Sequence, residues 1–527
     1  MSEATEGKIL TCKAAVAWKP GQPLDVTNIE VAPPGPGEIR VKVMSTAPCQ
    51  TDTLSLPGQH FPCVPGIEAT AVVESVGEGV TSVRVGDVVI PCYTPECRKQ
   101  SCIFCRDERT NLCPAIRATQ DQGLMPDGTT RLSKDGKEIF HFKGCSTFAE
   151  YAVIAEISAA KINPGADLDQ MCLLGGEVST GWGAVLNTTK VKPGTTVAVF
   201  GLGSLGLSVI QAAKVAGARY IVGVDRTEAQ FALAKKLGAS ECLNSTSCDV
   251  EQWLLSKEKC GYDYTFHCGG GLDTIRHALQ VAHSGWGESC ILQTLGADSE
   301  ITTTPFQLVT GRTLTGTTFG GWKSRTEVPK LVQTVMRGEM LLNPFITHTY
   351  PGLEDINRAL SALQQEWCVR PVVHIADSAL IPTALPSLKK KMRLDTGWLT
   401  RLSHWSECCQ CEMTFSFFLP DQDRTSPPPP VLYFLTGLTG SDESATQGIQ
   451  FAGEAARYGL AMAFPDTSPR GVNIPGEDDQ WDFGSSASFY VDATVDPWAR
   501  HYQMFTYITE EFPRLINVSV SSRDCRL

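Results

Sequence analysis

Four cysteines lie close together in the sequence at positions that could bind a metal ion. They are Cys97, Cys102, Cys105 and Cys113, in the pattern C-x4-C-x2-C-x7-C. Four thiolates at this spacing can form the tetrahedral shell of a structural zinc ion, which leaves no open position for a substrate. Such a site would hold a surface loop in place and would not catalyse a reaction. The alternative interpretation is a loop with free thiols, because the first gap is at the upper end of the usual ligand spacing.

A glycine-rich turn could bind the phosphates of a dinucleotide. The segment 201–206 reads G-L-G-S-L-G and matches G-x-G-x-x-G through Gly201, Gly203 and Gly206. The first glycine permits a tight turn, the second lets the backbone approach a pyrophosphate, and the third allows close packing of helix and strand. The turn follows the apolar run Thr196–Phe200 and precedes the helix-forming stretch 204–216. We therefore expect the phosphates at the N-terminus of that helix.

An acidic residue stands where such a site holds the adenosine ribose. Asp225 ends a second apolar run, Tyr220–Val224, and lies 19 residues after Gly206. Its carboxylate can accept hydrogen bonds from the ribose hydroxyls and would repel a 2′-phosphate. The cofactor is therefore predicted to be NAD, with the neighbouring Arg226 as the one feature that would suit NADP. A glycine-rich turn without a ligand is the alternative interpretation.

These candidate residues need a β-rich domain and a parallel α/β domain to position them. Short Val/Ile-rich runs such as Glu38–Met44 and Ala69–Val76 predict strands across about 8–176. Between about 190 and 320, apolar strands alternate with Gly turns and helical stretches, which indicates a parallel sheet. Residues 377–396 show no periodicity and are interpreted as a linker, and a second α/β unit is expected to begin with a strand at Val431–Leu435.

The overall composition is that of a globular protein. The 527 residues carry a net charge of −12, which gives no basic surface for nucleic acid or an anionic membrane. The 20 cysteines are interpreted as reduced thiols or metal ligands, because the N-terminus has no signal-peptide pattern. A cytoplasmic protein without nucleic-acid or membrane partners is therefore expected.

The sequence closely resembles class III zinc alcohol dehydrogenase, the glutathione-dependent formaldehyde dehydrogenase, over about residues 8–376. The resemblance is carried by the motifs above and by the words V-V-E-S-V-G at 72–77, G-L-M-P-D-G at 123–128 and F-G-G-W-K-S at 319–324. It implies NAD-dependent oxidation of S-(hydroxymethyl)glutathione, a homodimer, and the four cysteines as the structural zinc lobe. It also implies that Arg117 receives the glutathione carboxylate and that Arg370 contacts the cofactor pyrophosphate.

The family's catalytic zinc ligands are largely absent from this sequence. The family words C-H-T-D, G-H-E and L-L-G-C-G read C-Q-T-D at 49–52, G-I-E at 66–68 and L-L-G-G-E at 173–177. Cys49 is the one remaining ligand, because the isoleucine and the glycine that replace the other two offer no lone pair. Thr51 keeps the proton-relay hydroxyl, and Glu68 is kept as a candidate catalytic residue. An improvised site of Cys49, Glu68 and Glu177 is an open alternative.

The C-terminal part is similar to S-formylglutathione hydrolase, an α/β-hydrolase esterase, over about residues 395–517. The words P-D-T-S-P-R-G at 465–471 and F-Y-V-D-A-T at 489–494 carry this similarity. That family needs a serine on a G-x-S-x-G elbow, followed by an acid and a histidine. The sequence contains no G-x-S-x-G, so this part is expected to be an incomplete and inactive hydrolase.

The predicted fold class is α/β, with a GroES-like β-rich catalytic domain, a Rossmann domain and a partial α/β-hydrolase domain. The predicted boundaries are 1–177 completed by 326–376, 178–325, a linker at 377–396, and 397–527. The predicted activity is that of S-(hydroxymethyl)glutathione dehydrogenase. Two alternatives remain: a pseudoenzyme that binds NAD and structural zinc without turnover, and a zinc-free NAD(P)H reductase of the same superfamily.

Overall fold

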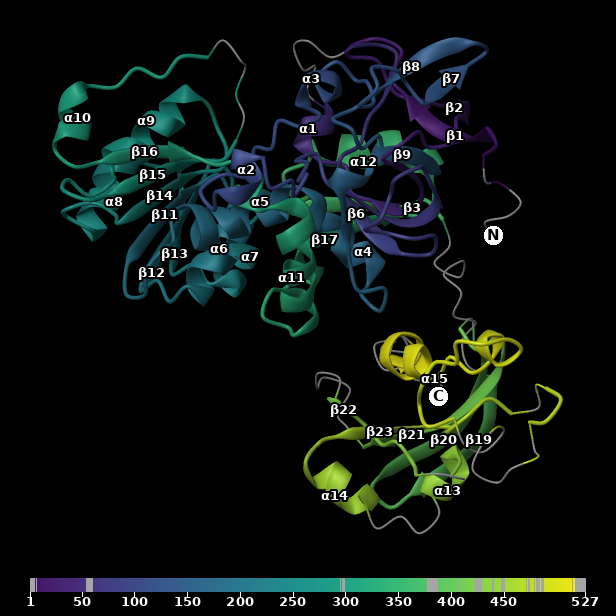
Figure 1. Ribbon diagram of the computed structural model, residues 1–527. Coiled ribbons are helices and arrows are strands. Elements are labelled where there is room, and N and C mark those ends of the chain that lie inside the picture. The colour runs from purple at the N-terminus through teal and green to yellow at the C-terminus, as the bar shows by residue number, and fades with distance from the viewer. Residues whose placement is uncertain are drawn as a thin grey trace. The chain divides into compact units, whose positions relative to one another are not determined.

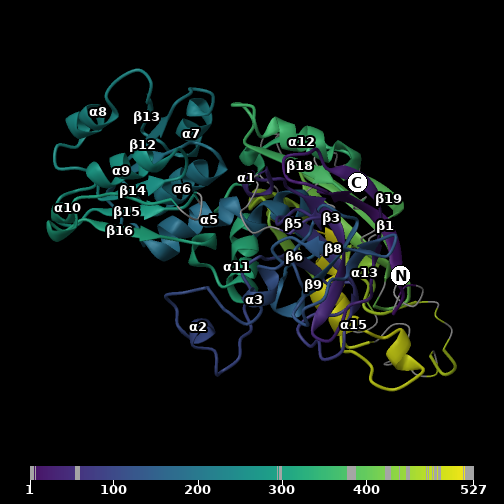
Figure 2. The ribbon, with the colours of Figure 1, turned by 90° about the horizontal axis from the view of Figure 1, so that it is seen from above.

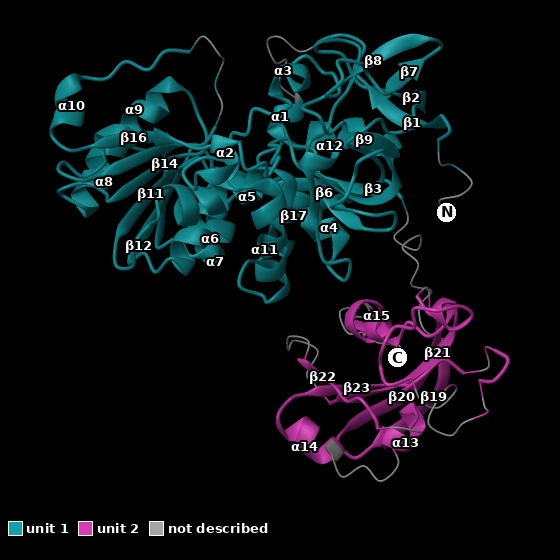
Figure 3. Cartoon of the chain, viewed as in Figure 1, with its two compact units in different colours: residues 1–377 teal, residues 378–527 magenta. Residues whose placement is uncertain are grey.

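The protein divides into two compact units, Met1–Asp377 and Ser378–Leu527 (Figure 3). No helix in the part of the chain described here combines the length and the apolar character needed to cross a membrane. The computed structural model describes residues 5, 7–53, 60–293, 295, 299–376, 387–406, 408–421, 429–437, 440–446, 451–470, 472, 474–477, 479, 484, 488–513 and 515–516.

Two sheets form the β-rich part of the first unit (Figure 1). One has the order β1 (Leu10–Val16), β2 (Asp25–Val31), β7 (Leu132–Lys134), β8 (Lys137–His141) and β4 (Cys63–Val64). The other has the order β10 (Ala159–Lys161), β6 (Val88–Pro91), β5 (Ala69–Val76), β3 (Glu38–Thr46), β18 (Arg370–His374) and β17 (Ile346–Tyr350), with β9 (Tyr151–Ala155) paired to β3.

The strand β3 connects the start and the end of this unit. Its side chains Ile39, Val41 and Val43 are fully buried in one core cluster with residues of β5. Strand β18 pairs antiparallel with β3, with Val373 opposite Thr46. This pairing brings Arg370, at the beginning of β18, beside the residues that follow β3.

The second part of the unit is a six-stranded parallel sheet with a doubly wound strand order. Its order is β13 (Glu241–Asn244), β12 (Tyr220–Asp225), β11 (Thr196–Phe200), β14 (Tyr264–His267), β15 (Glu288–Ile291) and β16 (Thr313–Gly316). The buried residues Ala198 and Phe200 of β11 pack in one cluster with Leu254 and Ala278 of two covering helices. The strand order reverses between the parallel strands β11 and β14. Doubly wound sheets bind ligands at such a point, beyond the carboxyl ends of the strands.

The expectations for this sheet are confirmed almost to the residue. The predicted strand 196–200 is β11, the run ending at Asp225 is β12, and the predicted helix is α6 (Ser204–Val215). The other helices around the sheet are α7 (Phe231–Leu237), α8 (Val250–Lys257), α9 (Leu272–Gln280) and α10 (Pro305–Val309).

The remaining helices of the first unit lie in or beside its β-rich part. They are α1 (Gln50–Thr53), α2 (Ile103–Arg106), α3 (Arg117–Gln120), α4 (Leu168–Met171), α5 (Glu177–Gly183), α11 (Ser324–Met336) and α12 (Ile356–Ala362), with 3-10 turns that include Cys172–Gly175 and Phe319–Gly321.

Helix α5 packs closely against α6. A Cβ atom on Gly181 of α5 would lie 2.4 Å from the Leu205 carbonyl oxygen of α6, so only glycine fits there. The Ser208 hydroxyl of α6 donates a hydrogen bond to the Val178 carbonyl at 2.6 Å. The N-termini of the two helices consequently meet.

The second unit begins earlier than the sequence predicted. Its sheet has the order β19 (Ser387–Leu394), β20 (Gly397–Ser406), β21 (Cys411–Pro420), β23 (Ala461–Pro465) and β22 (Val431–Tyr433), and its helices are α13 (Asp442–Thr446), α14 (Phe451–Arg457) and α15 (Met504–Thr506) (Figure 1). The prediction of a linker over 377–396 is therefore wrong for residues 387–394, whereas 377–386 lie outside the described residues. The prediction that this unit begins at Val431 is wrong as well.

The physical reason is that β19 is an edge strand. Its described side chains from Leu388 to Arg393 are exposed, so no alternation of apolar and polar residues marks it in the sequence. Charged residues such as Lys389, which pairs with Glu412 at 2.9 Å, are common on edge strands because they oppose further strand pairing.

Candidate functional site

The glycine-rich turn lies between β11 and α6, at the carboxyl end of the parallel sheet. Gly201 has a φ of 93°, and a Cβ atom there would lie 2.6 Å from the Gly269 backbone nitrogen. A Cβ atom on Gly206 would lie 1.8 Å from the Gly201 carbonyl oxygen, whereas one on Gly203 would meet open space. The first and third glycines are therefore required by close packing, and the second leaves room beside the helix N-terminus.

Asp225 lies beside this turn. Its Oδ2 atom accepts a hydrogen bond from the Leu202 backbone N–H at 2.7 Å, and its Oδ1 atom accepts one from Thr227 N–H at 3.2 Å. The structure thus brings the predicted cofactor residues Gly201, Gly203 and Asp225 together. Their spacing in the sequence was the signal that identified them.

Arg370 lies in a buried ion cluster with two glutamates. Its guanidinium donates from Nη2 to Glu68 Oε2 at 2.9 Å and to the Ala47 carbonyl at 2.9 Å. Its Nη1 atom donates to Glu68 Oε1 at 3.2 Å and to Glu177 Oε2 at 2.8 Å. The side chains of Arg370 and Glu68 are 0% exposed, so each charge depends on the other for compensation.

The Glu68 carboxylate is fixed from two sides. Besides its contacts with Arg370, its Oε1 atom accepts a hydrogen bond from the Glu177 backbone N–H at 3.0 Å. Burial is the largest influence on this carboxyl group and raises its pKa, against the opposing effect of the arginine charge. The hydrogen bonds from Arg370 to both of its oxygens, and not the pKa shift, fix the position of this carboxyl group.

This cluster occupies the space in which a cysteine at position 176 would lie. A Cβ atom on Gly176 would be 2.3 Å from Glu68 Oε1 and 2.8 Å from Glu68 Cγ. Because Arg370 and the Glu177 backbone hold Glu68 in place, the carboxylate cannot yield without breaking a buried ion pair. The residues present do not fit a catalytic zinc ion at this position.

Cys49 does not belong to a group of three or more potential metal ligands among the described residues. It is fully buried in a small apolar cluster with Ile67 and Phe142, and burial raises the pKa of its thiol well above the ordinary value. Among the described residues, the only group of three or more potential ligands is formed by Cys97, Cys102, Cys105 and Cys113. The alternative of a metal site made of Cys49, Glu68 and Glu177 stays a prediction, and in the structure both carboxylates bind Arg370.

Two further predicted site residues lie in short helices near this cluster. Thr51 is half-buried in α1, where Asp52 accepts a hydrogen bond from the Cys49 backbone N–H at 2.9 Å. Arg117 begins α3 and is half-buried, and its Nε atom has no hydrogen-bond partner in the described part of the chain. Their predicted roles, proton relay and glutathione binding, stay predictions.

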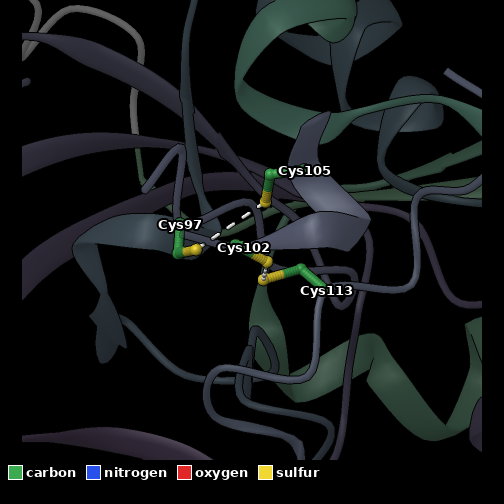
Figure 4. Close-up of side chains that lie close together, drawn as sticks. All are labelled: Cys97, Cys102, Cys105 and Cys113. Atoms are coloured by element: carbon green, nitrogen blue, oxygen red, sulfur yellow. Dashed lines mark hydrogen bonds between the residues drawn. The ribbon is translucent and has the colours of Figure 1, made fainter. Parts of the chain in front are cut away.

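The four clustered cysteines are arranged as zinc ligands. Their sulfur atoms all lie within 4.8 Å of one another, with Cys97 Sγ 3.7 Å from Cys105 Sγ and Cys102 Sγ 3.9 Å from Cys113 Sγ (Figure 4). A tetrahedral shell with Zn–S bonds of about 2.3 Å has sulfur atoms about 3.8 Å apart. The donor set therefore fits a structural zinc ion.

The loop that carries these cysteines projects from the unit around α2 (Figure 2). Its attachment is polar: Lys323 Nζ donates to the carbonyls of Cys105 and Asp107, both at 2.8 Å. Asn111 Nδ2 also donates to the Thr318 carbonyl at 2.8 Å. A metal ion would thus cross-link the four cysteines of a loop that hydrogen bonds already attach to the segment before α11.

Glu177 and Ser204 are the site residues that sequence reasoning missed. Glu177 was considered only as a metal ligand, whereas its carboxylate lies between Arg370 and the Ser204 hydroxyl, with which it forms a short hydrogen bond. The signal that could have identified this role is the exchange of the family's glycine for an acid directly at the start of a helix.

Three protein families match parts of the chain. The alcohol dehydrogenase GroES-like domain family matches residues 35–164, the zinc-binding dehydrogenase family matches 204–337, and a putative esterase family matches 406–525. The last match agrees with the predicted esterase-like region.

Known relatives match the first unit over nearly their full length. The chain is 50% identical over 380 residues to the class-3 alcohol dehydrogenase of Caenorhabditis elegans, with 70% of this chain and 98% of the relative covered. It is 50% identical over 368 residues to the S-(hydroxymethyl)glutathione dehydrogenase of Synechocystis, with 69% and 99% covered. Among solved structures, an alcohol dehydrogenase zinc-binding domain protein from Burkholderia ambifaria matches with a TM-score of 0.66 and 28% identity, over 70% of this chain and all of the other.

We expect the cysteine lobe to hold one zinc ion per chain. Replacing Cys102→Ser should remove that zinc, because three thiolates bind it far less tightly than four. Elemental analysis of the purified variant should show a loss from about one zinc ion to almost none. Cys260→Ser, at an exposed cysteine outside the lobe, is the control and should keep its zinc. Equal zinc contents in the two variants would contradict the assignment.

We expect Gly176→Ala to lower the free energy of unfolding by about 1–3 kcal/mol, because its Cβ atom would collide with the fixed Glu68 carboxylate. Gly203→Ala is the matched control, since its Cβ atom meets open space at a φ of −69°. Chemical denaturation of the two variants measures the difference. A Gly176→Ala protein as stable as the control would show that Glu68 is free to move.

Proposed function

The chain belongs to the class III alcohol dehydrogenase family, and from this premise we propose that it binds NAD and a structural zinc ion but does not oxidise S-(hydroxymethyl)glutathione by zinc catalysis. The observation that carries the proposal is that Ile67 and Gly176 offer no ligand atom beside Cys49, while the buried pair of Arg370 and Glu68 fills the space beside Gly176. A catalytic zinc ion needs three protein ligands and an open position. Among the described residues, Cys49 is not part of such a set of three ligands.

The residues for NAD are in place. The Gly203 backbone lies open at the N-terminus of α6, where pyrophosphate oxygens are bound by amide groups. Asp225 lies beside the turn and can accept hydrogen bonds from the adenosine ribose. Bound NAD would supply a hydride acceptor. In this chain, the cofactor would lie at the carboxyl ends of β11 and β14, where the strand order reverses.

The remaining residues of the former catalytic centre cannot activate an alcohol by themselves. Burial keeps Cys49 as a neutral thiol, since it raises the thiol pKa well above the ordinary value. The Glu68 carboxylate accepts hydrogen bonds from Arg370 on both oxygens, which holds it in the ion cluster. Without a metal ion to polarise the substrate oxygen, the main source of transition-state stabilisation in this chemistry is missing.

We expect wild-type protein to contain one zinc ion per chain and to show no turnover of S-(hydroxymethyl)glutathione with NAD. The triple variant Ile67→His, Gly176→Cys and Glu177→Gly restores the family words G-H-E and L-L-G-C-G, which carry the two missing ligands, and should contain about two zinc ions per chain with measurable turnover. Zinc analysis and NADH absorbance measure both properties. Two zinc ions and turnover in the wild-type protein would overturn the proposal, and turnover of enones by wild type would favour a zinc-free reductase.

The family's dimer is also proposed for this chain. The strand β16 is the last strand of the parallel sheet, and the preceding helix α10 exposes two large apolar side chains, Phe306 at 74% and Val309 at 81%. Exposed apolar patches of this kind mark protein–protein contacts. A second copy of the chain, joined along this edge, would cover them.

We expect the double variant Phe306→Glu and Val309→Glu to be monomeric where the wild-type protein is dimeric, because the charges would be buried in the interface. Light scattering after size-exclusion chromatography measures the mass. Val85→Glu, at an exposed residue of the β-rich part, is the control and should remain dimeric. A dimeric double variant would show that another surface forms the interface.

The prediction that the esterase-like unit has no hydrolase activity stays a prediction. It rests on the missing G-x-S-x-G motif in the sequence. The described strands of this unit form a mixed sheet, in which β22 and β23 are parallel and the other pairs are antiparallel.

A further inference from the structure

The carboxylate of Glu177 lies where two groups suited to bind a phosphate meet. Its Oε2 atom accepts hydrogen bonds from Arg370 Nη1 at 2.8 Å and from the hydroxyl of Ser204, the first residue of α6. Its Oε1 atom accepts the Gln50 backbone N–H at 3.3 Å. A guanidinium, a hydroxyl and the positive end of a twelve-residue helix would together bind an oxyanion, and here the chain itself supplies one.

The position of this carboxylate follows from the packing of two helices. Glu177 is the first residue of α5, and the close contact of Gly181 with Leu205 brings the start of α5 beside the start of α6. The Glu177 side chain therefore points toward Ser204 at the start of α6. It is 16% exposed, so solvent reaches it.

The charge of the cluster is unfavourable for a dinucleotide. One arginine faces two carboxylates, Glu68 and Glu177, so its positive charge is already matched within the protein. A pyrophosphate that approaches Gly203 brings two further negative charges to the same place. Like charges at contact distance in a partly buried site repel strongly.

We propose that Glu177 occupies the pyrophosphate position of the dinucleotide site and must be displaced before NAD binds, so that this one residue sets a low affinity for the cofactor. The proposal rests on the proposed NAD binding and adds a residue that controls it. The charged carboxylate of Glu177 binds Arg370 and Ser204. In the complex with NAD, the pyrophosphate would bind these two residues instead. The family's glycine at this position would leave both of them available.

The competing explanation is that Glu177 only stabilises the N-terminus of α5, where an acidic side chain is favourable. That role would affect the stability of the fold and would not distinguish one ligand from another. A fragment that lacks phosphate groups separates the two explanations, because only a pyrophosphate competes with the carboxylate.

The test is calorimetric titration of the full-length protein with NAD, ADP-ribose and adenosine. Glu177→Gln keeps the size and hydrogen-bonding capacity of the side chain, and Glu177→Gly removes it. We expect both variants to bind NAD and ADP-ribose about tenfold more tightly than wild type or better, and to bind adenosine unchanged. Glu339→Gln, at an exposed glutamate that pairs with Arg337, is the control and should bind like wild type.

The outcomes separate this inference from the proposed function. Equal NAD affinities in wild type and both Glu177 variants would overturn the inference and leave NAD binding intact. An equal gain for adenosine would overturn it too, because the effect would not then involve the pyrophosphate. If neither wild type nor any variant binds NAD, both the inference and the proposed NAD binding fail.

Discussion

The structure of the first unit depends on how one buried cation is neutralised. The Arg370 side chain is completely buried, and an unpaired guanidinium in that position would cost several kcal/mol. Glu68 pairs with it through both oxygens, and Glu177 and the Ala47 carbonyl complete the contacts. Here Arg370 provides the positive charge and the two glutamates are arranged around it.

This ion cluster connects parts of the chain that are far apart in sequence. Arg370 begins β18, which pairs with β3, so its guanidinium lies beside the backbone that follows β3. Glu68 comes just before β5, and Glu177 begins α5, which is packed against the dinucleotide helix α6. The β-rich part and the parallel sheet therefore share one electrostatic centre.

Local patterns predicted much of this arrangement. The G-x-G-x-x-G turn, the strand before it and Asp225 were identified because their geometry is set by close backbone packing within about thirty residues. The cysteine lobe was identified by ligand spacing. The position of Glu177 was not predictable, because it depends on contacts with Arg370, 193 residues away in sequence. The edge strand β19 was missed for a different reason, since its exposed lysines show no periodicity and its pairing with β20 is visible only in the fold.

The most direct test of the central claim is anomalous X-ray diffraction at the zinc absorption edge from crystals of the full-length protein. The account predicts one zinc peak per chain, among the sulfur atoms of Cys97, Cys102, Cys105 and Cys113, and no peak beside Cys49. Glu68 should remain paired with Arg370 in the same map. A second zinc peak beside Cys49, with Glu68 turned away from the arginine, would contradict the account.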